Sequence, residues 1–133
     1  MVPVDWLAVL AASVVSFMIG ALWYSPVLFL KPWLAATGNE KMDGHPPTVY
    51  LVSAIMTFLS VYALAVLIGP GRSPLFAAHV GVLTGALIVA ASIGINNRFA
   101  MESAAKWGID GGFHIVRLGV AGAVYAWIAG LTG

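Results

Sequence analysis

The chain has 133 residues, of which 61% are hydrophobic and only 8% are charged, and its formal net charge is +1. Soluble domains carry roughly 25% charged residues, so a soluble fold of this length could not cover its surface with so few charges. The composition therefore indicates a single domain surrounded by lipid, and the small net charge argues against nucleic acid as a partner. The chain contains no cysteine, which excludes disulfides, thiolate chemistry and cysteine-ligated metals.

The first membrane span is expected over residues 5–29, because the 25 residues between Asp5 and Lys31 are all uncharged and a span needs about 20. Asp5 stands where a signal peptide carries a basic residue, and the apolar run is longer than that of a signal peptide, so we expect no cleavage. Small residues recur every four positions, and such a face lets another helix pack closely, either within the chain or in a second copy. These residues are Ala8, Ala12, Ser16 and Gly20.

The longest polar segment is residues 31–47, which ends in a proline pair. Turn-forming residues cluster there, so the segment is predicted to be a loop. Lys31, Trp33 and Leu34 could lie in the headgroup layer as a short interfacial piece.

The second span is expected over residues 48–69 and the third over residues 74–96. The polar groups of the second span are hydroxyls, which can bond to carbonyls of their own helix. A glycine-rich turn with Arg72 at its tip separates the two spans, and Ser73 followed by proline is typical of a helix start. His79 is interpreted as a neutral interfacial histidine with one hydrogen bond, with a ligand or proton-carrying role as the alternative. The third span has its own small-residue face, formed by Ala77, Gly81 and Gly85.

A polar stretch, residues 96–117, joins the last two spans and holds five of the eleven charged residues of the chain. Groups of alternating sign recur there every four residues, at Arg98, Glu102, Lys106, Asp110 and His114. Neighbours at this spacing meet on a helix, but glycines interrupt the stretch. We therefore predict two pieces: a short one over residues 100–107, and a fourth span over residues 111–131 capped by Asp110. Its small-residue face is Gly122, Ala126 and Gly130.

Arg117 lies seven residues beyond Asp110, about 10 Å deeper along a helix, and shares a face with His114. An arginine at this depth is costly unless it reaches back to the headgroups or pairs within the bundle. Candidate partners are Asp110, Glu102, Tyr24 and a helix-end carbonyl. Contact with a substrate or a proton is a third interpretation.

Four spans place both termini on one side of the membrane. The loops 31–47 and 95–110 carry most of the basic residues, whereas the opposite side carries Arg72. Because Lys and Arg in short loops favour the cytoplasm, we expect both termini on the non-cytoplasmic side of the cytoplasmic (inner) membrane. The basic residues of the two loops are Lys31, Lys41, Arg98 and Lys106.

Two sequence patterns carry a resemblance to a known family. The first pattern comprises Gly20, Trp23, Tyr24, Ser25, Pro26 and Trp33, and the second Phe99, Glu102, Asp110, Gly112, Phe113 and His114. With these patterns the chain resembles the domain of unknown function 1761 family of small bacterial membrane proteins. It departs from the family in the spacing between Phe99 and Glu102, and in Phe113, where the family usually has tyrosine. The resemblance implies four spans and no particular activity.

The resemblance also suggests that polar side chains converge at the inner mouth of the bundle, either as an anchoring belt or as a site for a small headgroup or ligand. The candidate residues are Trp23, Tyr24, Asn97, Arg98, Glu102, Asp110, His114 and Arg117. No phosphate-binding loop, zinc-protease motif or nucleophile elbow is present. His79 and His114 should lie near opposite ends of a roughly 30 Å core, so shared haem ligation is not expected. We expect no metal and no cofactor.

The sequence thus predicts an all-α, polytopic membrane protein with a bundle of four transmembrane helices in one domain, residues 1–133. It favours a non-enzymatic structural or accessory role, with membrane lipids, a second copy or a larger membrane complex as partners. The alternatives are a small transporter or channel protomer, and a lipid-headgroup-binding enzyme with His114 as its base.

Overall fold

The computed structural model describes residues 3–40 and 44–133, so the predicted loop position Lys41 lies outside the described residues. The described part is helical and contains no strand. Its elements are α1 (Trp6–Trp23), α2 (Leu30–Thr37), α3 (Pro47–Ile68), α4 (Pro74–Leu83), the π-helix η1 (Thr84–Ala90), α5 (Ala91–Phe99) and α6 (Ala104–Thr132). Here α4, η1 and α5 form one continuous helix, Pro74–Phe99.

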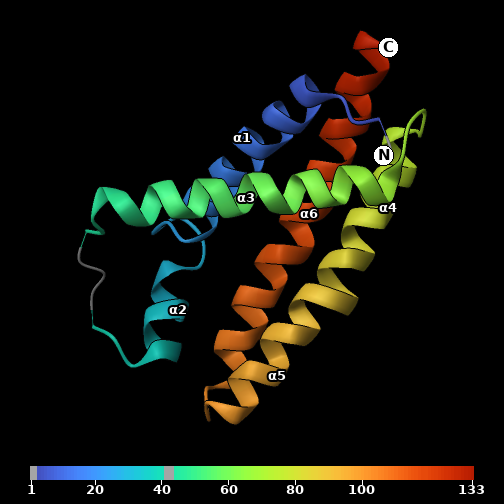
Figure 1. The fold of residues 1–133 in the computed structure, drawn as a ribbon. Coiled ribbons are helices and arrows are strands. Elements are labelled where there is room, and N and C mark those ends of the chain that lie inside the picture. Colours follow the sequence, from blue (N-terminus) through green and yellow to red (C-terminus); the bar gives the residue numbers. More distant parts are fainter. Residues whose placement is uncertain (1–2, 41–43) are drawn as a thin grey trace.

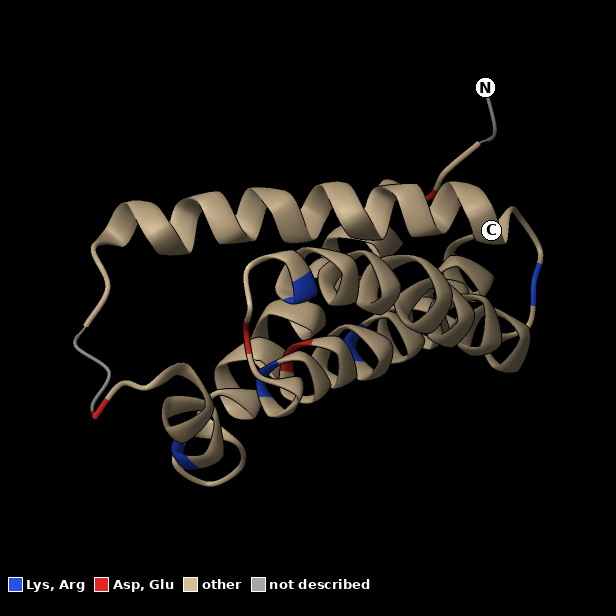
Figure 2. Ribbon diagram, turned by 90° about the horizontal axis from the view of Figure 1, so that it is seen from below, with Lys and Arg blue, Asp and Glu red and all other residues tan. Residues whose placement is uncertain are grey.

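Four helices are long and apolar enough to cross a membrane: α1, α3, the continuous helix Pro74–Phe99, and α6. Each has an 18-residue window with a mean hydropathy of at least 1.5, and a span needs about 20 predominantly apolar residues. The predicted all-α architecture with four membrane-spanning helices is thereby confirmed, and these helices support a membrane location. Figure 2 shows that charged residues are sparse along the chain and that the ribbon of α3 carries none.

The central element is α6, which contacts every other helix. Figure 1 shows α1 and α4 on different sides of α6, whereas α3 crosses α1 and α6 and projects beyond them with its N-terminal half. Both termini lie at the same end, where the Thr132 hydroxyl donates a hydrogen bond to the Asp5 carboxylate. The turn between α3 and α4 lies at this end as well, and the α5–α6 connection lies at the other.

The small-residue faces predicted from the sequence pack against each other within the chain. A Cβ atom at Gly81 would lie 2.0 Å from the carbonyl oxygen of Leu118, and one at Gly122 would lie 2.2 Å from that of Ala77. The backbones of α4 and α6 therefore touch directly, as helices in lipid do when glycine lines their contact. On α1, Ala8 and Ala12 are fully buried.

The third span contains a seven-residue π-helix, η1, against α6. The residues that face α6 from this span are Ala77, Gly81, Gly85, Ala90 and Gly94. They are four residues apart except for one five-residue step, from Gly85 to Ala90, and this step falls within η1. Five residues make about one turn of a π-helix, as about four do in an α-helix, so the wider turn returns Ala90 to the face that is directed at α6.

The predicted interruption before the fourth span is wrong, since α6 begins at Ala104 and continues without a break. Its N-cap is Ser103, whose hydroxyl accepts from the Lys106 amide, so Asp110 is not the cap. Gly111 and Gly112 serve close packing instead of ending the helix, whereas a Cβ at Gly108 would meet no atom within 4 Å. A Cβ at Gly111 would lie 3.1 Å from the Ala90 methyl carbon, and one at Gly112 would lie 3.4 Å from the Trp23 ring.

Helix α2 occupies part of the segment predicted as a loop, residues 31–47. It ends at Thr37, and the following C-cap residue, Gly38, has a left-handed φ of +73°, which suits glycine. The amide of Asn39 bonds to the carbonyl of Leu34, which satisfies an orphan carbonyl of the last turn. The segment between α1 and α3 therefore contains a defined helix that can present Trp33.

Candidate functional site

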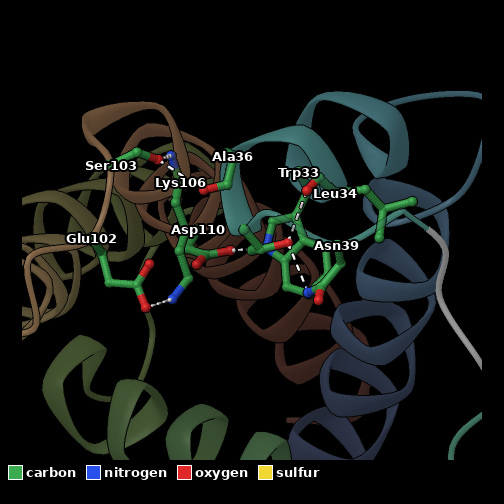
Figure 3. Close-up of polar contacts among 9 residues, drawn as sticks. Trp33, Leu34, Ala36, Asn39, Glu102, Ser103, Lys106 and Asp110 are labelled. Carbon is green, nitrogen blue, oxygen red and sulfur yellow. Dashed lines mark hydrogen bonds and ion pairs between the residues drawn. The ribbon is translucent and has the colours of Figure 1, made fainter.

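The strongest polar contacts between distant segments converge on Asp110 of α6. One oxygen of its carboxylate, Oδ1, accepts from the Tyr24 hydroxyl at 2.7 Å and from the Trp33 indole nitrogen at 3.0 Å. Figure 3 shows Trp33 of α2 reaching Asp110. At the preceding residue of each segment, the Trp23 indole nitrogen donates to the carbonyl of Ile109 at 3.1 Å. We call these five residues, Trp23, Tyr24, Trp33, Ile109 and Asp110, the aromatic latch.

The chain reversal after α1 explains how the aromatic latch forms. Helix α1 ends at Trp23, and Pro26, which has no amide hydrogen, follows closely. The amide of Phe29 then bonds back to the Trp23 carbonyl at 3.0 Å, which closes a tight turn. This turn directs Tyr24 and Trp33 toward α6, where the Tyr24 ring packs edge-on against Phe113 with centroids 5.4 Å apart.

Within the aromatic latch, the Tyr24 hydroxyl is held as the hydrogen-bond donor and the Asp110 carboxylate as the acceptor. Burial raises the pKa of the Tyr24 hydroxyl, and its hydrogen bond to Asp110 raises it further. The hydroxyl therefore stays protonated and donates to the carboxylate. Because both donors to Asp110 belong to the α1–α2 region, the contact fastens that region to α6.

A second polar group lies one and two turns further along α6, around Arg117. This residue is only 5% exposed. Its Nη1 donates to the Ser60 hydroxyl of α3 at 2.9 Å, and its Nη2 lies 3.1 Å from Nδ1 of His114. The guanidinium carbon is 5.7 Å from the centre of the Phe113 ring. We call Ser60, Phe113, His114 and Arg117 the arginine site.

Arg117 is thus paired inside the protein, and the prediction that it reaches the headgroups is wrong. The alternative interpretation, that Arg117 pairs within the bundle, is correct. Its partner is Ser60, however, and not Asp110, Glu102, Tyr24 or a helix-end carbonyl as predicted. The reason is that α3 crosses α6 at this level. Nε of Arg117 has no hydrogen-bond partner among the described residues, so the buried cation is only partly satisfied.

Five of the eight candidate residues come together, and three do not. Trp23, Tyr24 and Asp110 belong to the aromatic latch, and His114 and Arg117 to the adjoining arginine site. Asn97, Arg98 and Glu102 instead line a separate cavity of about 300 Å³ beside Trp107. There Glu102 forms the predicted ion pair with Lys106, with 3.0 Å between the charged atoms.

The candidate cluster lacked four residues that the structure places in it: Ser60, Trp33, Phe113, and Ile109, which takes part through its backbone carbonyl. Trp33 and Phe113 belong to the patterns of the family resemblance, which could have indicated them. Ser60 is one of several hydroxyls in an apolar span, and nothing in the sequence distinguishes it. His79, in contrast, makes one bond, to the Leu75 carbonyl at 2.8 Å, as predicted.

The chemistry open to these groups is limited by their surroundings. Two open cavities lie on the described part, and neither is lined by a residue of the aromatic latch or the arginine site. Within residues 3–40 and 44–133, no three His, Asp or Glu side chains are grouped to hold a metal ion. The polar residues bond mainly to one another, as expected of groups that hold helices together.

A family model described as protein of unknown function (DUF1761) matches residues 7–126. The chain belongs to this family. The match includes both halves of the aromatic latch, on the α1–α2 region and on α6, so the patterns that carry the resemblance meet in the fold. Comparisons with curated proteins and with solved structures found no match.

Proposed function

We propose that this chain is a self-associating structural protein of the cytoplasmic membrane, in which a second copy packs against the N-terminal half of α3. The supporting observation is that every residue from 47 to 56 is exposed. The large apolar side chains among them are Val49, Tyr50, Leu51, Val52, Ile55 and Met56. No other part of a long helix in the described chain is so fully without partners.

The intrachain packing supports this location for the interface. The small-residue faces on α1, α4 and α6 were the first candidates for self-association, but most of their residues are occupied by neighbouring helices. Gly130 is an exception, because a Cβ there would meet no atom within 4 Å. Helices in lipid associate by close packing, so a helix half without neighbours is the best remaining contact for a second copy.

The absence of cysteine from the sequence makes disulfide crosslinking a direct test. Ile55→Cys places one thiol on the exposed half of α3, and Val116→Cys places one on an exposed position of α6 as the matched control. Oxidation in lipid bilayers should link Ile55→Cys chains into dimers and leave Val116→Cys chains as monomers. Equal crosslinking of both variants, or loss of the dimer on dilution with lipid, would contradict the proposal.

We also propose that both termini face the non-cytoplasmic side. At the end with the termini, the turn between α3 and α4 carries Arg72, whereas the opposite end carries Lys31, Arg98 and Lys106. This asymmetry follows the preference of basic residues for the cytoplasm. Labelling of Arg72→Cys but not Arg98→Cys by an impermeant thiol reagent in whole cells is the expected result, and the reverse pattern would refute this orientation.

A transporter protomer is the second candidate, because one observation favours it. The π-helix η1 packs against the arginine site: a Cβ at Gly85 would lie 2.8 Å from the His114 carbonyl oxygen. Segments of π-helix are frequent at functional sites. Ion flux into vesicles that is lost in His114→Ala would favour transport over a structural role. An enzyme with His114 as base gains no support, since Arg117 occupies its Nδ1 and neither described cavity reaches it.

A further inference from the structure

The end of the bundle opposite the aromatic latch contains a cavity of about 360 Å³. It lies between the turn of residues 69–73, which joins α3 to α4, and the C-terminal part of α6. Its size is at the lower end of the roughly 300–1,000 Å³ found for small-ligand sites. Ala126, Ala129 and Gly130 form a wall of small residues, which leaves room beside the turn.

Tyr125 is the residue of this cavity that points most directly to a ligand. Its side chain is packed in the hydrophobic core and only 3% exposed, yet it lines the cavity. Its hydroxyl makes no hydrogen bond to any residue within 3–40 and 44–133, and its oxygen is not one of the fully buried side-chain atoms that lack a partner. The oxygen therefore keeps contact with accessible space, and since the side chain lines the cavity, the hydroxyl can donate to a group bound there.

The other wall of the cavity is electropositive. Arg72 lines it, with its guanidinium carbon 5.2 Å from the centre of the Phe76 ring. The amides of residues 71–73 donate to no acceptor among the described residues, and they lie in a turn in which Gly69 and Gly71 have positive φ. Ser73 caps the N-terminus of α4 at the same place, and a helix N-terminus favours anions.

No carboxylate opposes this charge within the cavity as described. Asp5, the acidic residue at this end, does not line it, and its carboxylate accepts hydrogen bonds from the Ala8 amide and the Thr132 hydroxyl. A ligand here would therefore meet a cation, free amides and a hydroxyl donor. Phosphate oxygens are matched to such a set of donors.

We propose that this cavity binds a phosphate group through Arg72, the amides of the turn and the Tyr125 hydroxyl. Two sources share this chemistry, the headgroup of a phospholipid and free phosphate. The cavity lies at the end of membrane-spanning helices, where lipid headgroups are concentrated. The proposal is independent of self-association through α3.

Native mass spectrometry of the protein released from phosphatidylglycerol bilayers tests the lipid source. Arg72→Gln removes the cation, and Tyr125→Phe removes only the hydroxyl and keeps the ring in the core. Arg98→Gln, which lies at the other end beside the other cavity, is the matched control. We expect one retained lipid in the wild type and in Arg98→Gln, and about tenfold less retention in the other two variants, as for the loss of a charge-assisted hydrogen bond. A phosphate-free glycolipid should not be retained.

Titration of inorganic phosphate into lipid-free protein in detergent tests the other source. Phosphate binding that is weakened by Arg72→Gln and Tyr125→Phe, without specific lipid retention, would identify free phosphate as the ligand. The proposal is overturned if neither lipid retention nor phosphate binding responds to these two substitutions. It is also overturned if the glycolipid is retained as well as the phospholipid. The melting temperature of each variant is the control, and a value close to that of the wild type excludes misfolding as the cause of the lost binding.

Discussion

The two sides of α6 are held by different kinds of contact. On the α4 side, backbone meets backbone, and the space at Gly81 and Gly122 is too small for a single added methyl group. On the α1–α2 side, aromatic side chains reach across to α6 through three hydrogen bonds, two to the Asp110 carboxylate and one to the Ile109 carbonyl. The first contact depends on shape and has no tolerance for added volume, whereas the second depends on donors and acceptors.

This difference shows where the fold can change and where it cannot. A steric contact between backbones has no alternative arrangement, because only separation of the helices relieves a clash. Polar side chains can exchange hydrogen-bond partners, and water or a lipid headgroup can take the place of a lost partner. Substitutions on the α4 side should therefore be the more damaging, and the first two predictions below test that order directly, while the other two extend it to weaker polar contacts of α6.

The largest effect is expected from Gly81→Ala. The added methyl carbon would lie 2.0 Å from the Leu118 carbonyl oxygen, so α4 and α6 must move apart. We expect a loss of unfolding free energy at the upper end of the range for overpacking, about 3 kcal/mol, measured by unfolding in detergent. Gly130→Ala is the control, since nothing lies within 4 Å of a Cβ there. Equal stability of the two variants would show that the helices do not approach so closely.

Asp110→Leu should come next, because it removes the acceptor of two donors at once. Each buried donor left without a partner costs about 1–3 kcal/mol, and partial exposure of Tyr24 and Trp33 places the total near 2 kcal/mol. Asp110→Asn keeps an oxygen at the same position and should lose about half as much. If both variants unfold alike, the hydrogen bonds of the aromatic latch do not hold α1–α2 to α6.

Ser60→Ala should have a smaller effect that depends on the arginine. It removes the hydroxyl that accepts from Arg117 Nη1, and because Ser60 is only half-buried, we expect a loss at the lower end of the range for a hydrogen bond to a charged group, about 1.5 kcal/mol. In an Arg117→Met background the same substitution should cost almost nothing. The double-mutant cycle therefore measures the coupling between α3 and α6. Additive effects of the two substitutions would mean that the contact is not formed.

The smallest effect concerns Asp5, where the two termini meet. A hydrogen bond from Thr132, and one from the Ala8 amide, lower the pKa of its carboxyl below 3.8 in the folded protein. A lowered folded-state pKa stabilises the fold above the unfolded-state value, and this stabilisation is lost as the pH falls through the folded-state value. The difference in melting temperature between wild type and Asp5→Asn should therefore be constant above about pH 5 and close as the pH falls below the unfolded-state pKa of about 3.9. A gap that does not close at acidic pH would contradict the assignment.

The sequence predicted the elements of this fold better than their contacts. Long uncharged runs indicated the four spans, because length and composition alone decide whether a helix can cross a membrane. The glycines of α6 were misread, since a glycine that admits Ala90 or Trp23 looks the same in a sequence as one that ends a helix. Asp110 at the start of an apolar run was likewise typical of a cap, but Ser103 has that role.

The partners in the candidate site were harder to predict, because they are far apart in the chain. Tyr24 and Asp110 are 86 positions apart, and Ser60 and Arg117 are 57 apart. Pairing at such distances depends on how α3 crosses α6, and the hydrophobic pattern of a membrane span, apolar on all sides, gives no crossing direction. The family patterns contain four of the five residues of the aromatic latch, Trp23, Tyr24, Trp33 and Asp110. A pattern specifies a residue type at each position, whereas composition does not.

The single five-residue step means that η1 holds one residue more than a regular α-helix needs to follow α6. Deleting one residue from η1 would therefore convert it to regular α-helix with little turn between the parts before and after it. The contacts of Gly81 and of Gly94 with α6 would both stay in place. The third span can thus lose one residue at this point without redirecting the far end of the protein.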